Sequence, residues 1–123
     1  MRPKKQRLKD KLWKLKSEYV RRIARGICFT CDAKNDWKLC QAGHFRHGVL
    51  DFDDDNIKCQ CVRCNKWLSG NLAEYATRLL WVLGKKKFDA LNARAYVAMG
   101  GERYENEWLE KEIEKYQDKL KSL

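Results

Sequence analysis

The stretch CQCVRCN, residues 59–65, decides the fold, because its last two cysteines repeat the spacing of CFTC at residues 28–31. Two Cys-x-x-Cys pairs within one chain are the usual sequence form of a tetrahedral zinc site with four thiolate ligands. The predicted ligands of a structural zinc ion are Cys28, Cys31, Cys61 and Cys64. Cys40 and Cys59 do not fit this spacing, so we expect both to be buried thiols.

The segment that joins the two cysteine pairs has a composition of its own. Residues 27–65 are rich in Cys, Gly, Asp and His and show no helical period, which favours short strands and turns around the metal. So small a centre is not expected to fold without the ion. Within it, Asn35 and Asp36 indicate a turn, and DFDDDN at residues 51–56 is expected to be a solvated acidic loop.

Helices are predicted on both sides of this centre. Residues 4–25 and 103–123 each carry apolar residues at three- and four-residue steps, which places those residues on one face of a helix. These two apolar stripes pack either on the protein's own core or on a second chain. Three more helices are predicted: from Val62 to Gly70, from the N-cap Asn71 to Gly84, and over 85–99.

The fold class is therefore α+β and mainly helical, with a small zinc-stabilised centre between N- and C-terminal helices. We divide the chain into a basic helical arm at residues 1–26, a zinc-containing domain at 27–101 and an amphipathic helix at 102–123. No apolar run approaches the roughly 20 residues that a bilayer span needs. No apolar signal-peptide core follows the basic N-terminus either. We expect a soluble, cytoplasmic protein without a membrane partner.

Positive charge is concentrated at the N-terminus. The net charge is +10, and residues 1–26 hold eleven Lys and Arg against two acidic residues. Such a segment favours a polyanion such as DNA, although a solvated helix face or binding to a membrane surface would fit it too. The predicted DNA-binding residues are Lys4, Lys5, Arg7, Lys11, Lys14, Arg21, Arg22 and Arg25, with Arg46, Arg63 and Lys66 beside the metal centre.

Side chains that suit phosphodiester hydrolysis lie between and just after the cysteine pairs. They are His44, within AGHFRHG at residues 42–48, Asn56 and Asn65. An imidazole can take a proton from water near neutral pH. An amide on the helix can help to hold a divalent cation against the phosphate, and a central Asn can fix the loop and orient the imidazole.

Three stretches of the sequence resemble a known family. GHF at residues 43–45, DDDNIKCQCVRCN at 53–65 and LSGNL at 68–72 are similar to the phage NinG/Rap recombination nucleases. That family resembles the HNH, or ββα-metal, endonucleases, which include the phage Holliday-junction enzyme endonuclease VII. The resemblance spans roughly residues 26–100 and implies a ββα-metal centre. It further implies cleavage of branched DNA with Mg²⁺ or Mn²⁺, in the bacterial host of a phage. Because a junction needs two cuts, a homodimer is expected.

The resemblance also implies roles for single residues. The four cysteines match structural zinc ligands, His44 matches the general base, Asn56 the central asparagine, and Asn65 a metal-binding residue on the helix. Many HNH enzymes have an Asp directly before the histidine, whereas this chain has Gly43. The catalytic ion is then held either by fewer protein ligands and more water or by a substitute ligand. The candidates are His47, Asp51, Asp53, Asp54 and Asp55, or His44 itself with the base elsewhere.

Two other functions fit the same residues. A non-catalytic, zinc-containing DNA-binding accessory protein of recombination would keep the cysteines and the basic helix. His44, Asn56 and Asn65 would then only stabilise a strand, a turn and a helix end. A sequence-specific HNH nuclease that acts on duplex DNA is the second alternative. Cleavage of branched against linear DNA distinguishes the three.

Overall fold

The computed structural model describes residues 2–123 and has the expected mainly helical α+β fold. Its regular elements, in chain order, are α1 (Lys4–Ile23), β1 (Gln41–His44), β2 (Ile57–Gln60), α2 (Leu72–Leu83), α3 (Lys85–Ala98) and α4 (Asn106–Lys121). Short 3-10 turns form at Trp37–Leu39 and Asp54–Asn56. The helix predicted from Val62 to Gly70 is reduced to one π-helical turn, Arg63–Trp67. No helix of the described residues has the length and apolar character required to cross a membrane.

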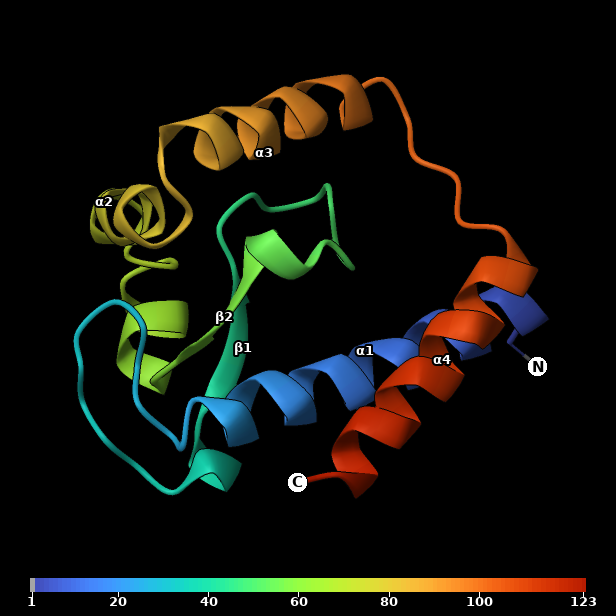
Figure 1. Cartoon of the computed structure of the whole chain (residues 1–123), viewed down its shortest axis with the longest axis horizontal. Coiled ribbons are helices and arrows are strands. Elements are labelled where there is room, and N and C mark those ends of the chain that lie inside the picture. The colour runs from blue at the N-terminus through green and yellow to red at the C-terminus, as the bar shows by residue number, and fades with distance from the viewer. Residues whose placement is uncertain (1) are drawn as a thin grey trace.

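A two-stranded antiparallel hairpin lies between two pairs of helices (Figure 1). In its register Gln41 pairs with Gln60, and His44 pairs with Ile57. Paired residues point to the same face of a sheet, and neighbours along a strand point to opposite faces. His44 therefore faces one side of the hairpin, toward α1, whereas Gly43 faces the other side together with Gln60.

The first core joins α1 to α4. The buried side chains of this core are Leu12, Phe52, Leu109, Ile113 and Tyr116. The apolar stripes of the first and last helices thus pack on each other within one chain, as Figure 1 shows for the two ribbons. This confirms the alternative in which the stripes belong to the protein's own core. The buried residues of the two stripes are therefore not free to contact a second chain.

The second core joins α2 and α3 to the loop after β1. Its buried side chains are Leu50, Tyr75, Leu79, Leu91, Ala95 and Ala98. Gly84 separates the two helices with a φ of +81°, a left-handed conformation that costs glycine little. The predicted end of α2 at this glycine is therefore confirmed.

The acidic stretch at 51–56 was expected to be solvated, and Asp51 is indeed exposed. The expectation is wrong for Asp53, Asp54 and Asp55, whose carboxylates bind side chains of the surrounding helices. Arg94 of α3 donates to the carboxylates of Asp53, at 2.8 and 3.2 Å, and Asp55, at 3.3 Å. Asp54 Oδ1 accepts from Lys16 Nζ of α1 at 3.0 Å and from Tyr116 Oη of α4 at 2.6 Å. Burial alone would raise the pKa of Asp54, but the hydrogen bonds from Tyr116 and Lys16 bring it below its usual value.

Candidate functional site

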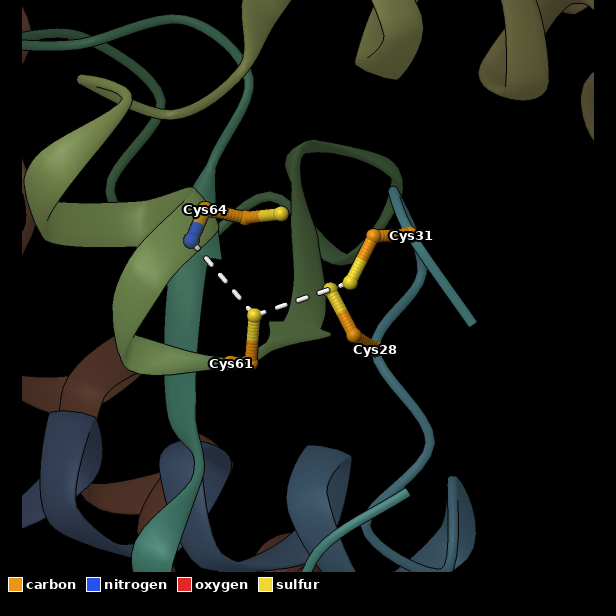
Figure 2. A group of neighbouring side chains, drawn as sticks. All are labelled: Cys28, Cys31, Cys61 and Cys64. Carbon is orange, nitrogen blue, oxygen red and sulfur yellow. Dashed lines mark hydrogen bonds between the residues drawn. The ribbon is translucent and has the colours of Figure 1, made fainter. Parts of the chain in front are cut away.

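The four cysteines of the Cys-x-x-Cys pairs form one cluster. Their sulfur atoms all lie within 4.8 Å of one another, and Cys31 Sγ is 3.7 Å from Cys61 Sγ. Four zinc–sulfur bonds of about 2.3 Å in a tetrahedron place the sulfurs about 3.8 Å apart, so the cluster fits a zinc ion. In Figure 2 the side chains point toward a common centre, two from the loop after α1 and two from the end of β2.

Polar groups around the cluster favour thiolates. Cys64 N donates to Cys61 Sγ at 3.4 Å, and Thr30 Oγ1 lies 3.4 Å from Cys28 Sγ. Burial acts to raise the pKa of Cys28, but the Thr30 hydroxyl and nearby backbone N–H groups lower it to about 6. Burial raises the pKa of Cys31 to about 12 and also raises that of Cys61. Cys28 is therefore the cysteine most readily held as the thiolate that binds zinc.

Asn71 also belongs to this environment, which the sequence did not predict. It stands at the N-cap position of α2, but its φ is +47° and its side chain caps no backbone N–H group. Its Nδ2 donates to Cys64 Sγ at 3.7 Å instead. The predicted capping of α2 by the Asn71 side chain is therefore wrong, because the Asn71 amide donates to the Cys64 sulfur instead.

The two other cysteines are buried, as predicted. Cys40 is 4% exposed and Cys59 is 2% exposed. Cys40 Sγ donates to the Gly26 carbonyl at 3.4 Å, and burial raises the pKa of Cys59 to about 12. Cys59 is thus held as a neutral thiol, and both cysteines lie outside the four-cysteine cluster.

His44 lies at the end of β1, with its imidazole held from two sides. Its Nε2 is 3.0 Å from the Asp51 carbonyl oxygen. The ring stacks on Trp13 of α1, with centroids 4.6 Å apart and planes 19° apart. A carbonyl oxygen only accepts, so Nε2 carries the proton, and Nδ1 of the neutral ring is then the nitrogen that can accept one.

Asn56 fixes the loop that holds His44. The residue is fully buried, and its Nδ2 donates to the carbonyls of Arg46 at 3.0 Å and Leu50 at 3.1 Å. Its Oδ1 accepts from Arg46 N at 2.7 Å. These bonds close the loop on the residues just before Asp51. The Asn56 amide therefore fixes the backbone of the loop, whereas the Nε2 atom of His44 is held by the backbone carbonyl of Asp51.

Asn65 lies on the π-helical turn directly after Cys64, on the other side of β1 from the His44 ring. Its Nδ2 donates to Gln41 Oε1 at 2.7 Å. Its Oδ1 would be 2.8 Å from a Cβ atom added at Gly43, and Gln60 Oε1 would be only 1.8 Å from that atom. The space of a side chain at position 43 is thus taken by Gln60, which explains why the chain has glycine there.

The other candidate ligands of a catalytic cation share no hydrogen bond with Asn65 in the described residues. His47 is exposed and lies beside Gly70. Asp53, Asp54 and Asp55 bind Arg94, Lys16 and Tyr116. The Asp51 carbonyl faces His44. Gln60, the nearest side-chain oxygen to Gly43, was missed because only the strand register brings the two residues together.

The predicted DNA-binding residues fall into two groups. Lys4, Arg7, Lys11, Lys14 and Arg25 are exposed along α1 and just beyond it. They recur at steps of three or four residues up to Lys14, on the side of α1 opposite the buried Leu12 and Lys16. Arg63 and Lys66 are exposed on the π-helical turn beside Asn65.

Others of the predicted basic residues have partners within the chain. Arg46 donates twice to Asn92 Oδ1, at 2.9 and 2.7 Å. Arg21 and Arg22 lie over the Trp37 ring, and Arg22 also pairs with Glu18. Among the exposed residues, Lys4 also has a partner, since its Nζ is 3.1 Å from Glu110. Lys5 is half-buried on α1.

Comparison with known proteins places the chain in a phage family. Residues 2–123 match the family model described as the bacteriophage lambda NinG protein. The protein ninG of Escherichia phage 933W is 31% identical over 114 residues, which cover 85% of this chain and 52% of that protein. The counterparts in Salmonella phage P22 and Escherichia phage lambda are 30% and 29% identical with the same coverage. The chain therefore spans about half the length of these relatives. No solved structure matches it.

Proposed function

Since this chain belongs to the NinG family of phage proteins, we propose that it is a metal-dependent endonuclease that cuts branched DNA such as Holliday junctions. The order of its parts supports this proposal. A β-hairpin leads through a cysteine pair into a helical turn, with His44 at the end of β1, Asn56 between the strands and Asn65 on the turn. This is the order that an HNH, or ββα-metal, nuclease would have.

The observation that carries the proposal is the state of the His44 ring. Its Nε2 donates to the Asp51 carbonyl at 3.0 Å, and Trp13 covers one face of the ring. The Nδ1 atom is left to accept a proton from a water molecule that attacks the phosphorus. A histidine that only stabilised a strand would not need a loop fixed by the buried Asn56 to hold one ring nitrogen.

Two metals have separate tasks in this proposal. The four cysteines hold zinc, which stabilises the end of β2 and the turn that carries Asn65. A bound Mg²⁺ or Mn²⁺ ion would supply a Lewis acid for the phosphate oxygens. Asn65 is its first ligand, since its Oδ1 is turned to the space above Gly43. His44 then serves as base rather than ligand, because its Nε2 is held by the Asp51 carbonyl and its Nδ1 is left to accept a proton.

The exposed basic residues of α1 bind DNA phosphates. Phosphate contacts carry no base sequence information and fix only the position of the DNA, which suits an enzyme that recognises the shape of a branch. Arg63 and Lys66 lie next to Asn65 on the same turn and bind the strand that is cut. Proteins of this kind act in the host cytoplasm, where the DNA of a phage recombines.

Cutting both strands of a junction requires two active sites and hence a homodimer. Leu12 of the first stripe and Leu109, Ile113 and Tyr116 of the last are buried, so we place the dimer contact on another surface. Trp81 of α2 and Tyr96 and Val97 of α3 are the best candidates, since they are 87%, 79% and 75% exposed. Trp81→Glu with Tyr96→Glu would then leave a monomer in sedimentation. If the wild-type protein is monomeric at all concentrations, with and without DNA, the proposed homodimer is contradicted.

The proposed function is tested by incubating a four-way junction and a linear duplex of the same sequences with the protein and Mg²⁺ or Mn²⁺. Cleavage of the junction in preference to the duplex is expected. Binding of the junction without cleavage under any of these conditions would instead support a DNA-binding accessory protein. Preferred cleavage at one sequence in the duplex would support a sequence-specific HNH nuclease.

A further inference from the structure

The side-chain amide of Gln60 has one oxygen without a partner. The residue is fully buried, and its Nε2 donates to Thr30 Oγ1 at 3.0 Å and to the Gly70 carbonyl at 2.9 Å. A carbonyl cannot donate, so the amide cannot be turned over without placing its oxygen against that of Gly70. Its Oε1 has no hydrogen-bond partner in the described part of the chain. Leaving such an atom unsatisfied costs about 1–3 kcal/mol, so a partner from outside the protein, a water or an ion, is expected for this oxygen.

A second amide oxygen points to the same place. Gln60 Oε1 and Asn65 Oδ1 lie 1.8 and 2.8 Å from the position that a Cβ atom at Gly43 would occupy. Asn65 is fixed in this orientation, because its Nδ2 donates to Gln41 Oε1. The backbone between the two amides is fixed as well, since Tyr75 Oη donates to the Gly43 carbonyl at 2.7 Å. Lys58, which pairs with Gly43 in the hairpin, extends its ammonium over the Phe29 ring.

We propose that Gln60 Oε1 and Asn65 Oδ1 together bind one hard divalent cation above Gly43. This inference rests on the proposed nuclease function, in which it supplies the second protein ligand of the catalytic ion. Carbonyl-type oxygens are ligands that Mg²⁺ and Mn²⁺ accept, and Mg²⁺ keeps several waters when few protein ligands are present. Because both ligands are neutral, the ion binds weakly to the free protein and more tightly when a DNA phosphate adds negative charge.

The arrangement also assigns a role to Gly43. Any side chain at this position meets Gln60 Oε1 at 1.8 Å, so glycine keeps the space open for the two oxygens and their ion. Gly43→Ala is therefore expected to displace the Gln60 amide and weaken cation binding, although it removes no ligand atom. In Gly43→Asp/Gln60→Ala the new carboxylate fills the space of the amide, and cation binding returns.

The most direct test uses the wild-type, zinc-loaded protein and Mn²⁺ alone. Paramagnetic Mn²⁺ broadens the NMR signals of nuclei near it. The side-chain NH₂ signals of Gln60 and Asn65 are expected to broaden at the lowest Mn²⁺ concentrations, before that of Gln117 on α4. Broadening that begins instead in the acidic stretch at 51–56, or equally at all three amides, would overturn the proposal.

Variants give the second test, with Mn²⁺ affinity measured by water-proton relaxation. Gln60→Met keeps the volume of the side chain but removes its oxygen, and the affinity is expected to fall at least about tenfold. Gln117→Met is the matched control and binds Mn²⁺ like the wild type. Unchanged Mn²⁺ binding by Gln60→Met would show that its oxygen is not a ligand. If Gln60→Met does not fold, as judged by its zinc content, the wild-type broadening experiment decides.

The two proposals can fail separately. If Mn²⁺ binds at Gln60 and Asn65 but the protein cuts no DNA, the cation site is supported and the nuclease function is contradicted. If a folded Gln60→Met variant binds Mn²⁺ like the wild type and cleaves the junction fully, the nuclease function is supported and Gln60 is not a ligand.

Discussion

At the scale of single residues, the imidazole of His44 is held at the end of β1 by partners from two other segments. Asp51 takes the Nε2 proton, and Trp13 covers one face of the ring. Neither partner is close to His44 along the chain, since one comes from the inter-strand loop and the other from α1. The ring is thus held by backbone and packing, and its Nδ1 atom remains available for chemistry.

Trp13 is expected to be a positioning residue. In Trp13→Leu the imidazole loses its stacking partner, and kcat for junction cleavage should fall roughly tenfold or more while KM changes little. The Cε1–H signal of His44 should also lose the shift caused by the indole ring. Trp108→Leu is the control, because Trp108 packs on Phe52 and Tyr104. Equal kcat values for the two variants would contradict the role of Trp13.

At the scale of elements, the acidic stretch at 51–56 joins three helices to the hairpin. Lys16 of α1 is its main partner. Only 1% of this side chain is exposed, and its Nζ donates to the Phe52 carbonyl at 2.8 Å and to Asp54 at 3.0 Å. Glu112 of α4 lies 3.4 Å from the same ammonium. The stretch therefore sets the position of α1, and with it the position of Trp13 against His44.

Loss of the Lys16 ammonium should destabilise the fold. Lys16→Met leaves the mostly buried Glu112 with only the more distant Lys115, at 3.8 Å, as its cationic partner among the described residues. The free energy of unfolding should fall by about 3 kcal/mol. Lys14→Met, on the exposed side of the same helix, should change it by less than about 0.5 kcal/mol. Denaturation in urea measures both. If Lys16→Met is as stable as Lys14→Met, the buried ammonium does not hold α1 to the acidic stretch.

Asp54 gives this contact a dependence on pH. Its pKa in the folded protein lies below the ordinary value of 3.8, so the carboxylate stabilises the fold at pH values above that number. The contribution is lost as the pH falls through the lowered folded-state pKa. The difference in unfolding free energy between the wild type and Asp54→Asn should therefore be constant above pH ~5 and shrink below pH ~4. A difference that grew on acidification would have the wrong sign.

At the scale of the whole molecule, the zinc cluster ties the N-terminal third of the chain to the hairpin and the turn that follows it. Cys28 and Cys31 come after α1, whereas Cys61 and Cys64 end β2 and begin the turn that carries Asn65 (Figure 2). Phe29 N also donates to the Cys59 carbonyl at 2.8 Å, so the metal adds to a backbone link between these segments. The metal therefore acts on the site indirectly, by fixing the backbone on which it is built.

Removal of one zinc ligand should unfold this centre. Cys64→Ser is expected to lose the zinc and much of its thermal stability, because zinc binding contributes directly to the folding of so small a centre. Cys59→Ser, which changes a buried thiol outside the cluster, should keep one zinc per chain. Zinc content by mass spectrometry and the melting temperature are the measurements. A stable, zinc-free Cys64→Ser protein would contradict the structural role of the metal.

The sequence was sufficient for features that depend on local spacing. The Cys-x-x-Cys pairs predicted the cluster, and the apolar stripes predicted α1 and α4, because ligand spacing and helical period are properties of short segments. Lys16 and Gln60 could not be recognised in this way. The burial of Lys16 depends on Asp54 and Glu112, and the role of Gln60 depends on the register that sets it against Gly43. Such partners are distant in sequence, so only the assembled fold identifies them.

The central claim is that His44 is the base of a nuclease, and single-turnover cleavage of a four-way junction with Mn²⁺ tests it most directly. Loss of a general base typically costs 10²–10⁴-fold in rate. His44→Ala is therefore expected to cut at least about 100-fold more slowly than the wild type while binding the junction equally well. His47→Ala, which changes the other, exposed histidine, should cut at the wild-type rate. Cleavage by His44→Ala at the wild-type rate would contradict the claim.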